Sequence, residues 1–149
     1  LSLSLSHLLS LSRPLYKSSN YLSVFPHTLS KIGEEVMSCT SLPPHFLSSF
    51  SSIWNKLDQP SGRNALYNLL LNSLSLSHPD GFRPWLVKET EDTGCHARRV
   101  MCTICGYCTY LICVNDTDYR RGYDLLYAAV SMVKEAEERE KKKERERER

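Results

Sequence analysis

Five of the six cysteines lie within nineteen residues, the only concentration of reactive side chains in the chain. They are Cys95, Cys102, Cys105, Cys108 and Cys113. Thiolate sulfur is a preferred ligand of zinc, and two residues between cysteines allow both sulfurs to face one ion. The candidate metal ligands are therefore Cys102, Cys105, Cys108 and Cys113, with His96 able to replace one, and the candidate cofactor is zinc.

Residues 102–107, Cys-Thr-Ile-Cys-Gly-Tyr, resemble the knuckle of zinc ribbons and rubredoxins. That resemblance implies a Cys-x-x-Cys-Gly turn between two strands, and the flanking residue types also favour strand. The three cysteines from Cys102 to Cys108 are similar to the start of a bacterial ferredoxin motif, but Cys113 lacks its spacing and its proline. No second knuckle exists, so neither family pattern is completed. We expect a small β-hairpin over residues 100–114.

Three interpretations without metal stand beside the zinc site. The cysteines are inert and buried on the hairpin, or they form disulfides in an oxidising compartment. The glycosylation triplet at residues 115–117 would fit the second. The third is that T-rich noncoding DNA, once translated, yields the Cys, Tyr, Ile, Leu and Val of this segment.

Two apolar stripes at helical spacing predict a helical hairpin over residues 45–74. The first helix is expected over residues 45–57 and the second over 64–74, with a Gln-Pro-Ser-Gly turn at residues 59–62 between them. A short break between two such helices is typical of antiparallel neighbours.

After the hairpin, Pro84 predicts a short extended segment at residues 82–87, because the residue before a proline avoids helical angles. A polar loop is expected over residues 88–94.

A long helix is expected over residues 118–145, with Asp116 or Thr117 as its cap. Its apolar stripe is expected to face the core and consists of Tyr123, Leu126, Tyr127, Val130 and Val133.

The end of that helix, residues 134–149, is charged at every position but Ala136 and holds eight basic and seven acidic side chains. Glu135 and Arg139 stand at a spacing that stabilises helices. No apolar residue follows Ala136, so this end is expected to be a solvated helix. Its charges are like those of a coiled coil, but it lacks the apolar seam along which coiled-coil helices pack. A protein partner of this charged helix is the alternative.

Both ends of the chain resemble translated dinucleotide repeats. Residues 1–12 are rich in alternating Leu and Ser, and residues 144–149 alternate Glu and Arg. The first methionine is Met37, which suggests a leader before it. Ser-rich, acid-free sequence is also the composition of an organelle transit peptide.

Composition gives no broad charge excess outside the tail, with eleven basic against ten acidic residues, so no strong nucleic-acid signal arises. No run of about eighteen apolar residues predicts a membrane span. We expect a disordered leader over residues 1–42, a small folded region over 43–133 that contains the Cys-rich segment 95–114, and a charged tail over 134–149. The expected fold is mainly α with one Cys-rich β-hairpin.

No pattern predicts an enzyme. The leading hypothesis is a chain without an assignable biochemical function, translated from repeat-flanked or leader DNA. The first alternative is an intracellular zinc-knuckle interaction module whose charged helical tail contacts a protein. The second is a small Cys-rich protein that is secreted or targeted to an organelle.

Overall fold

The computed structural model describes residues 33–92 and 96–149, and within these ranges the chain is helical and contains no strand. A short helix at residues 33–38 precedes five longer ones. These are α3 (Pro44–Trp54), α4 (Pro60–Ser73), α5 (Phe82–Asp92), α6 (His96–Asn115) and α7 (Tyr119–Glu148).

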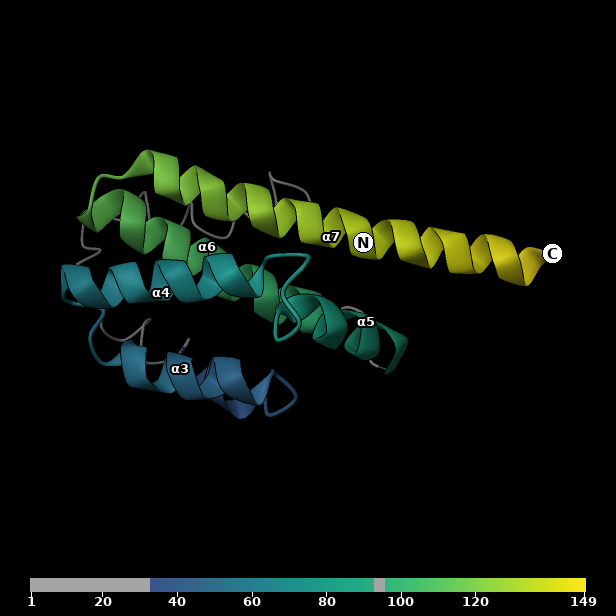
Figure 1. Cartoon of the computed structure of the whole chain (residues 1–149), viewed down its shortest axis with the longest axis horizontal. Coiled ribbons are helices and arrows are strands. Elements are labelled where there is room, and N and C mark those ends of the chain that lie inside the picture. Colours follow the sequence, from purple (N-terminus) through teal and green to yellow (C-terminus); the bar gives the residue numbers. More distant parts are fainter. Residues whose placement is uncertain (1–32, 93–95) are drawn as a thin grey trace.

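Helices α3 and α4 form the expected helical hairpin and run side by side in opposite directions (Figure 1). Pro44 and Pro60 each stand at a helix start, where the missing N–H has no partner to lose. The turn brings the backbone of Gly62 against the carbonyl of Lys56, and a Cβ at residue 62 would lie 1.9 Å from that oxygen. Only glycine fits so close an approach.

Helix α5 replaces the extended segment expected at residues 82–87 and the expected polar loop as far as Asp92, and the last two residues of that loop lie outside the described residues. Pro84 is the third residue of this helix. In the first turn a proline removes no intrahelical hydrogen bond, so it does not interrupt the helix. The sequence interpretation placed the proline outside a helix when it lies just inside the start of one.

The expected Cys-rich β-hairpin at residues 100–114 is wrong, because this segment is the centre of α6. Residues 104–112 are all buried, and α6 contacts α4, α5 and α7. A helix covered on several sides needs apolar residues all round, and this composition is easily mistaken for a buried strand.

The long C-terminal helix exists as α7, and Leu126 and Val133 of its expected stripe are buried, but the two tyrosines of that stripe do not face the core. Its buried residues are Gly122, Leu125, Leu126, Ala129, Met132, Val133 and Ala136. Tyr123 and Tyr127 face solvent instead, with 61% and 75% of their surfaces exposed. The small residues Gly122 and Ala129 face the core in place of the tyrosines, which lets α7 approach α6 closely.

Aromatic side chains join the hairpin to α5. The Phe46 and Phe82 rings meet edge to face at 4.9 Å, and Phe50 stacks on Trp54 at 4.7 Å. The indole N–H of Trp85 donates to Ser41 Oγ at 3.2 Å. Buried aromatic pairs of this kind stabilise a fold beyond the area that they remove from water.

The expected disordered leader, residues 1–42, falls outside the described residues as far as residue 32. Of its last ten residues, Val36 and Leu42 are buried in the core. Packing therefore begins before Pro43. Among the described helices, none has the length and apolar character that crossing a membrane requires.

Candidate functional site

The structure places the four candidate zinc ligands along one helix. Eleven residues separate Cys102 from Cys113, and at 1.5 Å per residue they lie about 16 Å apart along the axis. A zinc ion holds each sulfur at about 2.3 Å, so four ligands must converge within a few ångströms. Among the described side chains, no group of three or more His, Cys, Asp or Glu stands close enough to hold a metal. The zinc set stays a prediction, one that requires residues 102–113 to leave this helix.

The cysteines whose side chains are described point into the protein. Cys105 and Cys108 are buried, and Cys113 is half-buried. Burial raises the pKa of the Cys108 thiol well above its ordinary value and outweighs the opposing effect of Arg121. Burial also raises the pKa of Cys113, and Asp118 raises it further. Both thiols are therefore protonated at neutral pH, a form that is a weak nucleophile and a weak ligand.

Cys113 lies at a point where α6 and α7 approach closely. A Cβ at Gly122 would lie 2.4 Å from Cys113 Sγ and 3.3 Å from Thr109 Cγ2. The absent side chain of Gly122 makes room for the sulfur. This cysteine therefore has a packing role that its spacing in the sequence did not indicate.

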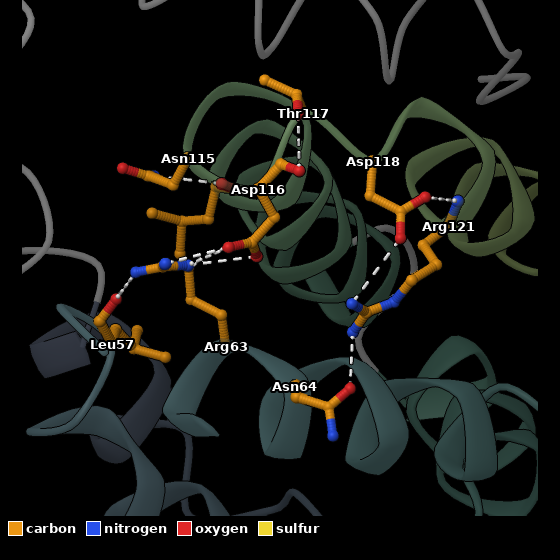
Figure 2. Close-up of polar contacts among 9 residues, drawn as sticks. Leu57, Arg63, Asn64, Asn115, Asp116, Thr117, Asp118 and Arg121 are labelled. Carbon is orange, nitrogen blue, oxygen red and sulfur yellow. Dashed lines mark hydrogen bonds and ion pairs between the residues drawn. The ribbon is translucent and has the colours of Figure 1, made fainter. Parts of the chain in front are cut away.

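The most elaborate polar group lies where the α6–α7 connection meets the start of α4 (Figure 2). Arg63 Nε donates to both carboxylate oxygens of Asp116 at 3.1 Å, and its Nη2 lies 2.9 Å from Oδ1. Nη1 donates to the Leu57 carbonyl at 3.0 Å. The side chain of Arg63 is 8% exposed and that of Asp116 19%. A forked guanidinium–carboxylate contact of this kind fixes orientation as well as charge.

A second arginine adjoins this group at the start of α7. Arg121 Nη2 donates to Asn64 Oδ1 at 2.9 Å, and its guanidinium lies 4.3 Å from the centre of the Tyr67 ring. Asp118 caps α7 by accepting from the backbone N–H of Arg121 at 3.2 Å. The cap is therefore Asp118, and the expected caps Asp116 and Thr117 belong to the connection, where Thr117 has a φ of 51°. Arg63 therefore joins α4 to the α6–α7 connection, and Arg121 joins α4 to the start of α7.

Three further ion pairs join α7 to itself and to its neighbours. Glu135 Oε1 accepts from Arg83 of α5 at 2.7 Å and from Arg139 at 2.6 Å. Arg98 of α6, with a side chain only 6% exposed, pairs with Glu140. The pair between Glu135 and Arg139 was expected from its spacing, whereas the links to α5 and α6 join residues far apart in the chain. These contacts hold α7 on the bundle as far as Glu140.

Beyond Glu140 the helix continues past the last of these ion pairs. Residues 141–149 are exposed at every position, and Figure 1 shows this end extending past the other helices. It carries six basic side chains and three acidic ones, a side-chain charge of +3. We call residues 141–149 the projecting segment. It is the part of the described chain that is most available to another molecule.

Sequence reasoning missed the two arginine contacts of the α6–α7 connection. Arg63 and Asp116 are fifty-three residues apart, and each alone has the appearance of an ordinary surface charge. Arg63 stands just before the helix expected at residues 64–74, so nothing in the sequence marked its side chain as buried or indicated an acidic partner for it.

No protein-family model, curated protein or solved structure matches the chain. Function is therefore inferred from its own residues.

Proposed function

We propose that the protein is a small helical interaction module that binds an acidic protein surface through the projecting segment of α7. The observation that carries this proposal is the exposure of residues 141–149 at every position on a helix that extends past the bundle. A helix that is polar on every face buries no apolar surface against the bundle, so core packing does not explain why α7 continues beyond it. Contact with another molecule would explain this length.

The charge of the segment favours an acidic partner. Lys141, Lys142 and Lys143 form a basic block at its base, before the alternation of Glu and Arg. Their side chains are exposed, so a carboxylate-bearing surface can reach them without displacing a core contact. Exposed ion pairs contribute roughly 0.5 kcal/mol each and weaken in salt, so binding through this block is expected to be weak and dependent on salt.

A binding assay with a defined probe tests the proposal. The probe is a fluorescein-labelled peptide of sixteen residues that alternates Glu and Ala, and the readout is fluorescence anisotropy at low salt. Replacing all three lysines of the basic block by Gln is expected to weaken binding about tenfold, because three contacts of about 0.5 kcal/mol are lost. A chain ending at Glu140 is expected to lose binding.

The matched control is Lys56→Gln, which removes an exposed lysine from the α3–α4 turn. It is expected to leave the affinity unchanged. Weakening by the control of about one third of the block variant's loss in binding free energy, the share of one lysine in three, would show that net charge alone attracts the probe. Tighter binding of poly-uridine than of the peptide would overturn the proposal in favour of RNA.

The competing hypothesis, a translated repeat without a selected role, makes a different prediction. It expects no binding that depends on the projecting segment, and it expects the tryptic peptide of residues 64–88 to be missing from the source cells. Detection of that peptide, together with loss of probe binding in the truncated chain, favours the interaction module.

A further inference from the structure

We infer that the solvent face of α7 is a self-association surface, on which a second copy of this chain docks in the antiparallel direction. This surface is separate from the projecting segment. We define the outer face of α7 as the six residues that follow one another at spacings of four and three along its exposed side: Arg120, Asp124, Tyr127, Ser131, Lys134 and Glu138.

The outer face has the geometry of a helix-pairing seam. Alternating spacings of four and three place residues along one line of a helix, as in the a and d positions of a coiled coil. All six residues are exposed, and on the opposite side of α7 the buried residues face α6. The outer face spans nineteen residues and is about 27 Å long from the first to the last. It is therefore long enough to lie against an equal length of a second helix.

The centre of the outer face carries more apolar surface than a solvated helix requires. Tyr127 is 75% exposed and Tyr123 beside it is 61% exposed. Val130 is only partly covered by the core. Tyrosine is enriched at protein interfaces because its ring gains from burial while its hydroxyl stays in contact with water. Two exposed tyrosines one turn apart therefore favour an interface at this point.

The order of charges along the outer face selects the partner. Reading from the start of α7, it carries a positive, a negative, two uncharged, a positive and a negative side chain. Two copies placed antiparallel about residue 129 bring Arg120 opposite Glu138 and Asp124 opposite Lys134, each pair twice. Tyr127 then lies opposite Ser131 of the second copy. Every charged position meets its opposite, so the face is complementary to itself.

The alternative arrangements lack this complementarity. In a parallel pair each residue faces its own counterpart, which places four like charges in contact. Shifting the antiparallel pair by seven residues in one direction places Tyr127 opposite Glu138 and Ser131 opposite Lys134, so both of those charges lose their partners. Arg120 then faces Arg145, and only Asp124 still meets an opposite charge, at Lys141. Like-charge contacts and lost ion pairs thus oppose the wrong orientation and the wrong register.

Each charged residue of the outer face is available for such a pair. Among the described residues, no ion pair involves Arg120, Asp124, Lys134 or Glu138, whereas Glu135 and Glu140 on the adjoining faces are engaged within the chain. The seam is narrow, so the dimer is expected to be weak, with a Kd on the order of 100 µM at low salt.

Charge exchange tests both the pairing and its direction, with sedimentation equilibrium of the full chain as the readout. Lys134→Asp places a carboxylate opposite Asp124 of the other copy, so that two negative charges face each other at both symmetric positions. It is expected to weaken the dimer at least about tenfold. Asp124→Lys is expected to do the same. The two changes combined restore opposite charges and are expected to return the Kd to within about threefold of the original.

The controls separate this surface from other effects. Lys56→Asp makes the same charge change on the α3–α4 turn and is expected to leave the dimer intact. A chain ending at Glu140 keeps the whole outer face and is expected to dimerise, so loss of probe binding through the projecting segment does not decide this inference. Circular dichroism of each variant checks that α7 stays helical.

Three results would overturn the inference. A full chain that remains monomeric at about 1 mM and low salt has no such interface. A combined variant as weak as either single variant contradicts the antiparallel register, because restoration arises only when residues 124 and 134 face one another. Dimerisation that persists in Tyr127→Ala and in Lys134→Asp alike places the interface elsewhere on the protein.

Discussion

Removing the carboxylate of Asp116 is the sharpest test of how this bundle is held together. Asp116→Ala leaves the guanidinium of Arg63 almost fully buried, with only the Leu57 carbonyl still accepting from it. Loss of one partner of a buried ion pair costs about 3–5 kcal/mol, because the remaining charge is neither paired nor hydrated. Asp116 is 19% exposed, so water reaches part of the gap and the lower value applies. We expect the free energy of unfolding to fall by about 3 kcal/mol.

Urea unfolding followed by circular dichroism at 222 nm measures this loss, and thermal unfolding is expected to show a Tm lower by roughly 15 °C for a domain of this size. Asp58→Ala, which removes an exposed carboxylate from the α3–α4 turn, is the matched control and is expected to change stability by less than about 0.5 kcal/mol.

A double variant separates the cost of an unpaired charge from the value of the pair itself. Arg63→Met together with Asp116→Ala removes both charges and keeps an apolar stem in the space of Arg63. Because an uncharged replacement leaves no buried ion, the double variant is expected to lose no more than about half of what the single variant loses. A loss below about 1 kcal/mol for Asp116→Ala, or a double variant as unstable as the single one, refutes this reasoning.

Three further predictions concern the cysteines and their surroundings. Gly122→Ala is expected to destabilise the fold by about 1–3 kcal/mol through overpacking against Cys113, and adding Cys113→Ala to that variant should recover most of the loss in urea unfolding. In native protein a thiol-specific reagent is expected to modify Cys39 before Cys108, which is expected to react only on unfolding, as peptide mapping by mass spectrometry would show. Zinc added to reduced protein is expected to bind below one ion per chain while α6 stays helical; one bound ion with unchanged helical dichroism contradicts the geometry of α6.

Helix α6 shows why the strand propensity of its residues did not predict its structure. Its residue types favour strand, and its apolar residues occur too continuously to display a period. A buried helix and a buried strand then have the same appearance in sequence, and only the neighbouring elements separate them. Contacts with α4, α5 and α7 stabilise the helix and override the local preference. The expected zinc knuckle is a turn between two strands. Because this segment is helical, the four cysteines do not have the arrangement that the knuckle requires.

The direction that α7 faces was equally undetermined. Tyr123 and Tyr127 lie on the side of α7 that faces away from the buried stripe, and either set of residues forms an apolar line. Packing against α6 determines which set faces the core. Gly122 and Ala129 allow α7 to lie close to α6, whereas tyrosines in their place would keep the two helices further apart. A single helix considered alone contains no information about which residues its neighbour can accept.

What the sequence by itself determined is local. The α3–α4 hairpin follows from two apolar stripes and the break between them, although Pro60, expected within a turn at residues 59–62, begins α4. The solvated end of α7 follows from the absence of any apolar residue after Ala136. Only the tertiary structure decided the helical state of α6, the outward tyrosines and the pairing of Arg63 with Asp116. These depend on contacts between residues far apart in the chain, whose free energy exceeds the small differences in local propensity.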